Sequence, residues 1–505
     1  MTPRTAPGED FAPRPRLMSR LLVPAVLLAL AVLAVVAVIR LPPLLACGGL
    51  GSGVAERGGE CIGVTDGSPA FLPGPEELHE EYRHIQSLIK EENDRVARGD
   101  RPSVGIALIS TLTPDEDGPL SPEQVLHSLQ GAYVAQKRAN HDAEARLGDP
   151  GLQIRLHLAN AGKVQDKWEP VVGELTGMTD DEAPLIAAVG WGLSVRDTAD
   201  AARRLSAAGI PMVSSVASAT GLNHGEIPGL VRVTPANDDF VRALAEYADA
   251  REDLRTAALV WDENAVDLHV STLTEAFREH LGDRITSEEP FGGTTVTDEY
   301  RYVEFFNIVQ NICGSGADMV LFSGRTGNLH DFLERLRGRY CDERPVTVLF
   351  VETGPVIGKA EVARLDGAGI TVVQASANDP RWSLEEDSGA PKGFAPFYRA
   401  YQEHLPGEER PAVLADGYAM AHHDALMTAV LAVRSQYSER RGELPSSAQI
   451  RPALFQLKEA NAIEAASGTL QFPAAREGDP GGRPVPVIEI PDRGTGHRVY
   501  HTPLE

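Results

Sequence analysis

Hydroxyl-bearing and charged residues follow several short apolar runs in this sequence. In the first half of the chain they are Ser194 and the stretch Ser214–Ser218, and in the second half they are Arg325, Glu352 and Thr353. Ser194 precedes a predicted helix, whose free backbone N–H groups favour a carboxylate. Glu352 suits an ammonium group. These residue types together suit a zwitterionic small molecule, although Ser194 alone can be a helix cap and Glu352 a solvated loop residue.

The sequence has no motif of a known catalytic centre. It lacks a GxSxG nucleophile elbow, a phosphate-binding loop, an HExxH zinc motif and a GxGxxG after a strand. His422, His423 and Asp424 invite a metal interpretation, but adjacent helical residues point about 100° apart and do not readily share one ion. We therefore expect a binding protein rather than an enzyme, with no cofactor and no metal.

Alternating strands and helices position the candidate ligand residues. Apolar runs such as 104–109, 184–189 and 346–351 predict strands buried on both faces, with helices between them. This alternation predicts parallel sheets wound by right-handed crossovers, and ligands bind beyond the carboxyl ends of such strands. Because the pattern restarts near residue 257, we expect an α/β fold with two doubly wound parallel-sheet lobes.

Extended segments join the two predicted lobes. Val231–Asp238 leaves the first unit, Val372–Pro380 leaves the second, and a third crossing is expected near Ala465. A chain that crosses repeatedly between lobes is suited to hinge motion. The resulting assignment gives residues 101–235 and 378–465 to lobe 1, and residues 236–377 and 466–505 to lobe 2.

An uninterrupted apolar run, Leu21–Ile39, predicts a transmembrane helix. Its 19 residues would span about 28 Å, close to the thickness of a bilayer core. Three arginines between residues 14 and 20 precede it, which places residues 1–20 in the cytoplasm and the bulk of the chain outside the cell membrane. The alternatives are a cleaved signal peptide and a lipoprotein whose lipid-bearing residue is Cys47.

Residues 40–100 are predicted to form a linker and a charged helix. Gly and Pro are frequent in 40–75, whereas apolar residues recur at helical spacing in 76–98. The formal net charge of −25 argues against a nucleic-acid partner, because phosphates would be repelled.

Four cysteines lie in the part of the chain expected outside the cytoplasm, where disulfides form: Cys47, Cys61, Cys313 and Cys341. They allow three connectivities, and none of their spacings is the CxxC of many zinc sites. Local pairing, Cys47 with Cys61 and Cys313 with Cys341, closes the shortest loops.

Four stretches, in chain order, resemble type I periplasmic binding proteins, specifically the branched-chain amino-acid (Leu/Ile/Val)-binding branch of the substrate-binding proteins of ABC transporters. The resemblance covers about Arg101 to Val499. The stretches are Ala188-Val189-Gly190 with Ser194 and Ala208–Ser214, then Leu230–Pro235, then His423-Asp424-Ala425, then Gly468–Phe472 followed by Gly478-Asp479.

Position by position, the resemblance implies a ligand site. Ser194 and Ser218 fall where the family's hydroxyls hold an amino-acid carboxylate, and Val216 falls where a backbone group contacts the ligand. Glu352 or Thr353 falls near the family's ammonium-binding acid.

Two departures from the family pattern bear on the ligand's identity. Val266 replaces an aromatic residue, and Arg325 stands near another aromatic position. Branched-chain specificity is therefore not expected to carry over, and Arg325 favours a more acidic ligand.

The resemblance implies an extracytoplasmic solute-binding protein. Such a protein would close on a small amino-acid-like ligand between its lobes and deliver it to an ABC permease. The alternative is a ligand-sensing or scaffold domain that retains the same fold and reports to a signalling partner.

Overall fold

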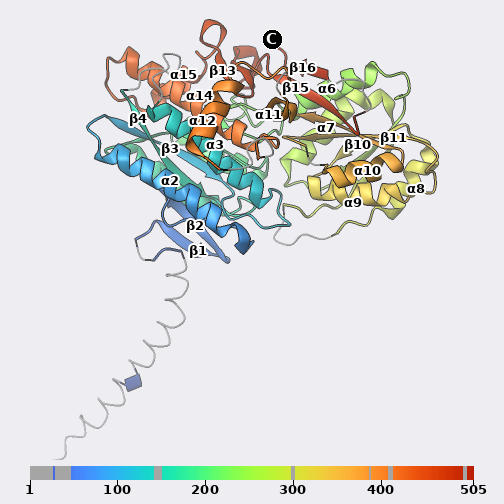
Figure 1. Ribbon diagram of the computed structural model, residues 1–505, viewed down its shortest axis with the longest axis horizontal. Coiled ribbons are helices and arrows are strands. Elements are labelled where there is room, and N and C mark those ends of the chain that lie inside the picture. The colour runs from blue at the N-terminus through green and yellow to red at the C-terminus, as the bar shows by residue number, and fades with distance from the viewer. Residues whose placement is uncertain are drawn as a thin grey trace, which may run out of the picture.

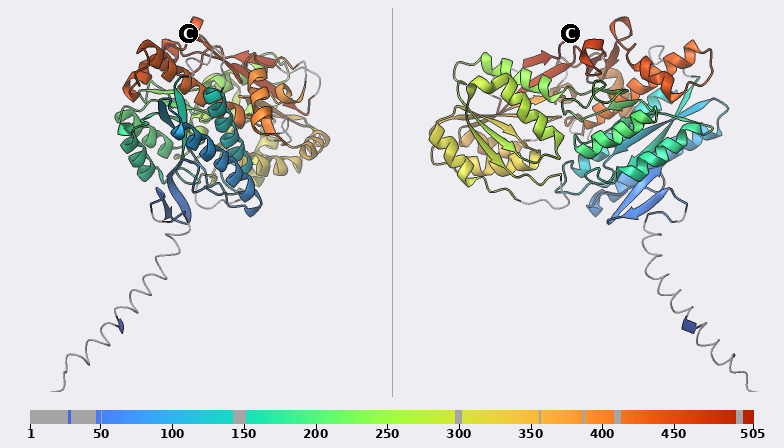
Figure 2. Two further views of the ribbon diagram at one scale, coloured as in Figure 1. Left: turned by 60° about the vertical axis from the view of Figure 1, so that its left-hand side comes forward. Right: turned by 180° about the vertical axis from the view of Figure 1, so that it is seen from behind.

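The computed structural model describes residues 27–28, 47–49, 51–141, 151–296, 302–355, 357–385, 388–407, 413–492 and 498–505. Within them the chain forms two α/β lobes that lie side by side (Figure 1). The C-terminal end lies at the junction of the lobes, on the opposite side of the molecule from the N-terminal hairpin (Figure 2). The expectation of two lobes with parallel sheets is confirmed.

The predicted transmembrane segment Leu21–Ile39 lies outside the described residues, apart from Leu27 and Leu28. In the described part of the chain, none of the helices combines the length and the apolar character needed to cross a bilayer.

A sheet of seven described strands forms the centre of lobe 1. Strands β4 to β7 and β3 run parallel, and the hairpin β1–β2 joins them antiparallel at one edge. In spatial order the strands are β1 Val54–Arg57, β2 Glu60–Thr65, β4 Gln153–Asn160, β3 Ser103–Ser110, β5 Leu185–Gly190, β6 Met212–Ser214 and β7 Leu230–Arg232.

Helices cover both faces of this sheet, as expected for strands that are apolar on both sides. One face packs against α2 His79–Arg98, α3 Pro122–His141, α12 Phe394–His404, α14 Tyr418–Glu439 and α15 Ser447–Leu454. The other face packs against α4 Trp168–Gly177 and α5 Arg196–Ala207. Lobe 1 therefore takes helices from a later part of the chain, which returns to it after lobe 2.

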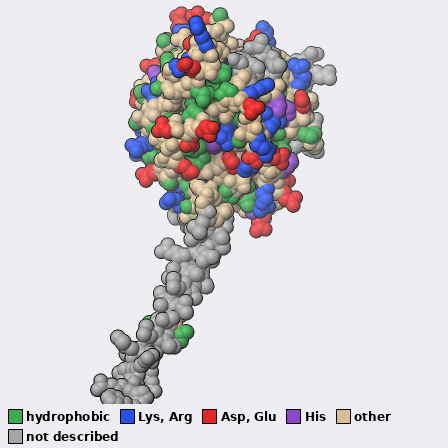
Figure 3. Space-filling model, turned by 90° about the vertical axis from the view of Figure 1, so that its left-hand side faces the viewer, with side chains coloured by type: hydrophobic (Ala, Val, Ile, Leu, Met, Phe, Trp, Pro, Cys, Tyr) green, Lys and Arg blue, Asp and Glu red, His purple; other side chains and the backbone are tan. Residues whose placement is uncertain are grey.

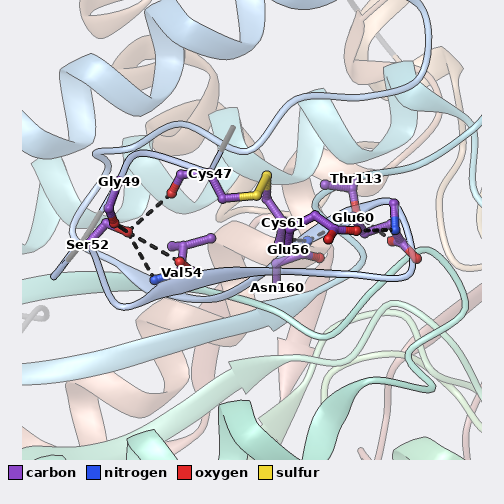
Figure 4. The surroundings of a disulfide bond; sticks show 10 residues. Cys47, Gly49, Ser52, Val54, Glu56, Glu60, Cys61, Thr113 and Asn160 are labelled. Atoms are coloured by element: carbon purple, nitrogen blue, oxygen red, sulfur yellow. Dashed lines mark hydrogen bonds between the residues drawn. A yellow bond between two sulfur atoms is a disulfide. The ribbon is translucent and has the colours of Figure 1, made fainter. Parts of the chain in front are cut away.

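The hairpin β1–β2 differs from the linker that composition predicts for residues 40–75. Its strands pair with the sheet through β2 and β4. Asn160 donates from Nδ2 to the carbonyl of Cys61 at 2.7 Å, and Thr113 donates to the Glu60 carboxylate at 2.8 Å (Figure 4). The glycines that made this segment resemble a linker form its turns, where positive φ is needed, as at Gly58 and Gly59.

Lobe 2 has a second sheet of seven described strands. Five are parallel, and β15 and β16 extend the sheet antiparallel at one edge. In spatial order they are β16 Arg498–His501, β15 Pro484–Ile490, β12 Ile370–Ser376, β11 Val346–Glu352, β10 Met319–Ser323, β8 Ala257–Asp262 and β9 Ile285–Phe291.

The second sheet is also covered on both faces. Helices α6 Asn237–Asp249 and α7 Leu268–Leu281 pack on one face. Helices α8 Phe306–Ser315, α9 Thr326–Arg337 and α10 Lys359–Gly367 pack on the other. The remaining described elements are the short helix α11 Arg381–Leu384, the hairpin β13 Ile463–Ala465 with β14 Gly468–Leu470, and five single turns of 3₁₀ helix, at Glu76–Leu78, Met178–Asp180, Gly282–Arg284, Glu459–Asn461 and Ala474–Arg476.

Both predicted disulfides are confirmed. Cys47 is bonded to Cys61 and Cys313 to Cys341. The first joins the segment before β1 to β2 (Figure 4), and the second joins α8 to the loop after α9. Because the Cys47 sulfur is in a disulfide, it is not the thioether that a lipoprotein would carry at this residue.

Charge is distributed rather than concentrated on the outer side of lobe 1. Acidic and basic side chains are intermixed over the face in Figure 3. The formal net charge of −25 does not gather there into a single acidic patch.

Candidate functional site

All six ligand residues predicted from the sequence line one cavity between the lobes. Glu352 is the last residue of β11 and the other five come from loops after strands of both sheets, as expected for the carboxyl edges of parallel strands. The lining is Pro119, Leu120, Gly192, Ser194, Val216, Ser218, Phe240, His269, Arg325, Val351, Glu352, Thr353 and Tyr418. Residues that are distant in the sequence, from both lobes, thus contribute to one site.

The two serines of lobe 1 already have partners inside the protein. Ser194 accepts a hydrogen bond from the backbone N–H of Ala219 at its Oγ (3.1 Å), and its carbonyl accepts from the N–H of His269 (3.0 Å). Ser218 Oγ lies 3.0 Å from Nδ1 of His269. Ser194 therefore stands before helix α5, as predicted, but its hydroxyl binds a neighbouring loop rather than the N-terminus of that helix.

His269 is the cavity residue that reaches across from lobe 2. It lies in the first turn of α7 and is buried. Burial lowers the pKa of its imidazole to about 3, and the charge of Arg325 acts in the same direction. The ring is therefore neutral at pH 7, and it sits against the hydroxyl that the sequence assigned to a ligand carboxylate.

Arg325 is held by an ion pair within lobe 2. Its Nε and Nη2 each donate to a different oxygen of Asp267, both at 2.8 Å. Asp267 is fully buried and also caps α7 by accepting from the N–H of His269. Burial opposes the charge on Arg325, but the Asp267 carboxylate raises the pKa of the guanidinium. Arg325 therefore already has a carboxylate partner inside the protein, which weakens the sequence-based prediction that it favours an acidic ligand.

Glu352 ends strand β11 and has neutral contacts. One carboxylate oxygen accepts from the Thr326 hydroxyl and the other from the backbone N–H of Thr353, each at 2.8 Å. The Thr353 side chain is hydrogen-bonded to Tyr418, which belongs to α14 of lobe 1. Burial raises the pKa of the Tyr418 phenol, and the charge of Glu352 adds to that effect.

The lobes are closed around this cavity. Its volume is about 20 Å³, room for about one water molecule. Val195 and Asp267 form an antiparallel bridge across the lobes, and the N–H of Arg196 donates to the carbonyl of Val266 at 3.1 Å. A ligand larger than a water molecule therefore needs a wider separation of the lobes before it enters.

The paired histidines that invited a metal interpretation have separate partners. His422 Nε2 lies 2.9 Å from the Ser215 hydroxyl, whereas His423 lies between Arg138 and Asp424, at 3.0 and 2.8 Å. Their side chains diverge, as the helical geometry predicts. His423 and Asp424 also border an open groove of about 690 Å³ on lobe 1.

One other group of metal-ligating atoms occurs among the described residues. Asp238, Glu279 and His280 have ligand atoms within 4.8 Å of one another. Asp238 is already contacted by His280 at 2.6 Å and by Arg242 at 2.7 Å. Arg242 thus already balances the charge of one of the group's two carboxylates.

Sequence reasoning missed four residues that shape the cavity: Asp267, His269, Phe240 and Tyr418. Asp267 had a local signal, since an Asp before an apolar helical pattern marks an N-cap. The other three have no such signal, because they meet the cavity only when the two lobes pack together.

Comparison with solved structures identifies the fold. The isoleucine complex of the branched-chain amino acid transporter substrate-binding protein LivJ from Streptococcus pneumoniae matches with a TM-score of 0.56 at 16% identity, covering 80% of this chain and 100% of that one. The leucine-binding protein LivK from Thermotoga maritima matches with a TM-score of 0.55 at 14% identity, over 79% and 99%.

A third match widens the range of ligands among the similar structures. An ABC-transporter solute-binding protein from R. palustris in complex with 4-hydroxybenzoate has a TM-score of 0.55 at 14% identity, covering 80% of this chain and 96% of that one. The chain thus has the fold of the type I periplasmic binding proteins, as the sequence resemblance implied. No protein-family model matches the sequence, and neither does a curated protein.

Proposed function

We propose that this chain is a solute-binding protein that holds a small molecule between its two lobes and delivers it to an ABC permease. One observation carries the proposal: six residues chosen from sequence, three from each lobe, line one cavity at the carboxyl edges of both sheets. The fold supports it, because the similar structures are binding proteins of ABC transporters. The same comparison favours transport over the alternative of a signalling sensor.

The ligand proposed from sequence is amino-acid-like, with Glu352 at the ammonium group. Ser194, Val216, Ser218, Arg325 and Thr353 complete the proposed site. Neighbouring structures hold isoleucine, leucine or 4-hydroxybenzoate, so the fold alone is compatible with ligands of different charge.

A non-catalytic role is part of the proposal. Ser218 and His269 lie at hydrogen-bond distance, the arrangement of a nucleophile and its base. Burial lowers the pKa of His269 to about 3, which makes it a poor acceptor for a serine proton at neutral pH. The pair is better suited to packing the cleft than to acyl transfer.

The proposed location is the outer side of the cell membrane, with Leu21–Ile39 as a single-pass anchor. This anchor rests on the apolar run and on the arginines before it. The disulfide at Cys47 supports it against lipid attachment at that residue. N-terminal sequencing of the membrane-bound protein tests it: a mature chain that starts after residue 39 would rule the anchor out.

Binding itself is tested with the full chain purified without denaturation. Mass spectrometry of released small molecules identifies a bound ligand, and thermal shift with a solute panel measures its effect. Val216→Trp fills the cavity and should abolish the shift. Val499→Trp, at a residue that is 44% exposed in β16, is the control and should retain it. No released molecule and no shift with any solute would refute the function.

A further inference from the structure

Two charged side chains line the interlobe cavity, Arg325 and Glu352, and Asp267 pairs with Arg325 from behind the lining, so the three groups together sum to one negative charge. Arg325 contributes a guanidinium, whereas Asp267 and Glu352 each contribute a carboxylate. His269 adds no charge at neutral pH, since burial depresses its pKa. A half-buried carboxylate without an ionic partner favours a ligand that supplies a positive charge.

Glu352 is the carboxylate of this group that forms no ion pair among the described residues, although its charge adds to the raised pKa of Arg325. Asp267 uses both of its oxygens on the Arg325 guanidinium. The contacts of Glu352 are instead the hydroxyl of Thr326 and the N–H of Thr353, which are neutral. An ammonium group at this carboxylate would form the charge-assisted hydrogen bond that the protein itself does not provide there.

The opposite wall of the cavity offers a carboxylate very little. The hydroxyl of Ser194 accepts from Ala219, and the hydroxyl of Ser218 is at hydrogen-bond distance from the His269 ring. The nearest guanidinium, that of Arg325, is held by Asp267. The Ser194 hydroxyl keeps its own proton to donate, but an anionic group placed there would meet no free cation and would have to displace the contact between Ser218 and His269.

Two aromatic side chains of the cavity add to the preference for a cation. Phe240 from α6 of lobe 2 and Tyr418 from α14 of lobe 1 are both buried and line the same space as Glu352. Aromatic rings attract cations through their quadrupole, most strongly where water is excluded.

We propose that the cleft selects a small primary amine that lacks a carboxylate, with Glu352 binding its ammonium group and His269 excluding the carboxylate that an amino acid would carry. His269 is thereby the specificity-determining residue. The proposal rests on the proposed function, since it requires that the cleft binds a solute, and it names an amine in place of the amino-acid-like ligand expected from the sequence.

The test compares ligands that differ only in the carboxylate. Calorimetry on the full chain is carried out with methylamine, ethylamine, isobutylamine and isoamylamine, and with their parent amino acids glycine, alanine, valine and leucine. At least one amine should bind about tenfold or more tightly than its amino acid, the ratio expected when the carboxylate displaces one internal hydrogen bond, since both ligands share the ammonium group. Equal or tighter binding of every amino acid would overturn the proposal and leave the solute-binding function intact.

Two variants separate specificity from stability. His269→Ala should raise the affinity for the amino acid relative to its amine by about tenfold or more, while His280→Ala, on the same helix but outside the cavity, should leave the ratio unchanged. His269→Asn is the substitute if His269→Ala does not fold. An unchanged ratio in the His269 variant, or a panel in which nothing binds the unaltered protein, would overturn the proposal. If nothing in the panel binds, a co-purified solute of another chemical class would still support the proposed solute-binding function.

Discussion

Arg483 donates from Nε to the backbone carbonyl of Val233 at 3.1 Å. The two residues belong to different connections between the lobes, and Nη2 of the same guanidinium donates to the carbonyl of Ala377, on a further connection, at 3.0 Å. One fully buried side chain thus links all three crossings. Burial lowers the pKa of Arg483 to about 10, against the opposing effect of Asp424, so the residue remains charged at neutral pH.

Arg483→Lys tests the importance of this link. Lysine keeps the charge but not the planar fork that reaches two carbonyls at once. We expect the free energy of unfolding to fall by about 1–3 kcal/mol, because hydrogen bonds from a charged donor are lost in a buried place. Urea titration measures the change. Arg255→Lys is the control, since Arg255 is exposed and donates to the carbonyl of Glu252; an equal loss in both variants would contradict the assigned role.

Asp267→Asn removes one partner of the buried pair with Arg325. Breaking a buried ion pair on one side typically costs about 3–5 kcal/mol, because the other charge stays buried without its partner. The variant should lose stability of this size in denaturant titration. Asp253→Asn breaks the pair with Arg251, in which the aspartate side chain is 64% exposed, and should cost at most about 1 kcal/mol. Similar costs for the two variants would show that Arg325 finds another partner.

The sequence predicts the strands well where burial on both faces leaves no polar position. Residues 104–109 are an example, since they lie within β3 and all are buried. The hairpin β1–β2 escapes the same reasoning because all four residues of β1 are at least partly exposed and glycines flank it. An edge hairpin needs neither an unbroken apolar run nor a long one.

The site is predictable to the extent that it depends on strand ends. Ser194, Val216 and Glu352 were found from their position after predicted strands, because parallel strands end at the same edge. His269, Tyr418 and Arg483 act only across the interface of the lobes. Local patterns carry no information on how the lobes dock, so these residues required the tertiary structure.

Gly131→Ala probes the packing of α3 against α14. A Cβ at Gly131 would lie 1.9 Å from the carbonyl oxygen of Ala419, part of the α14 backbone, so the two helices would have to move apart. We expect a loss of about 1–3 kcal/mol, as for other overpacked cores. Gly173→Ala in α4 meets nothing within 4 Å and should instead stabilise by up to about 1 kcal/mol. Thermal unfolding of the two variants distinguishes the effects.

His422 should make the stability of the protein depend on pH. Burial lowers the pKa of its imidazole from 6.5 to about 4. Between these values the unfolded chain binds a proton that the folded chain does not, so the free energy of unfolding falls as the pH falls, by up to about 1.4 kcal/mol per pH unit.

Unfolding titrations at pH 7, 6 and 5 measure this dependence. His422→Asn should reduce the slope by up to one proton, because other titrating groups are common to both proteins. His84→Asn, at an exposed position of α2, is the matched control. A slope that is the same in all three proteins would mean that His422 is protonated in the folded state at these pH values.

Gly354→Ala should oppose closure of the lobes without unfolding either of them. A Cβ at Gly354, which follows β11 in lobe 2, would lie 2.2 Å from the carbonyl oxygen of Asp416. Asp416 belongs to lobe 1, where it contacts His127 of α3 at 2.6 Å. Both groups are backbone, so the added methyl cannot be accommodated by a rotamer change. The lobes must therefore separate near the cavity.

The expected result is an increased radius of gyration in small-angle X-ray scattering, with a weaker affinity for any ligand that needs the closed form. The free energy of unfolding should change by less than about 1 kcal/mol, since each lobe keeps its own core. Gly314→Ala in α8 meets nothing within 4 Å and should leave the radius of gyration unchanged. If Gly354→Ala scatters like the unaltered protein, the close approach of Gly354 and Asp416 does not limit closure. The lobes would then be held together mainly by the contacts between Val195 and Asp267 and between Ser218 and His269.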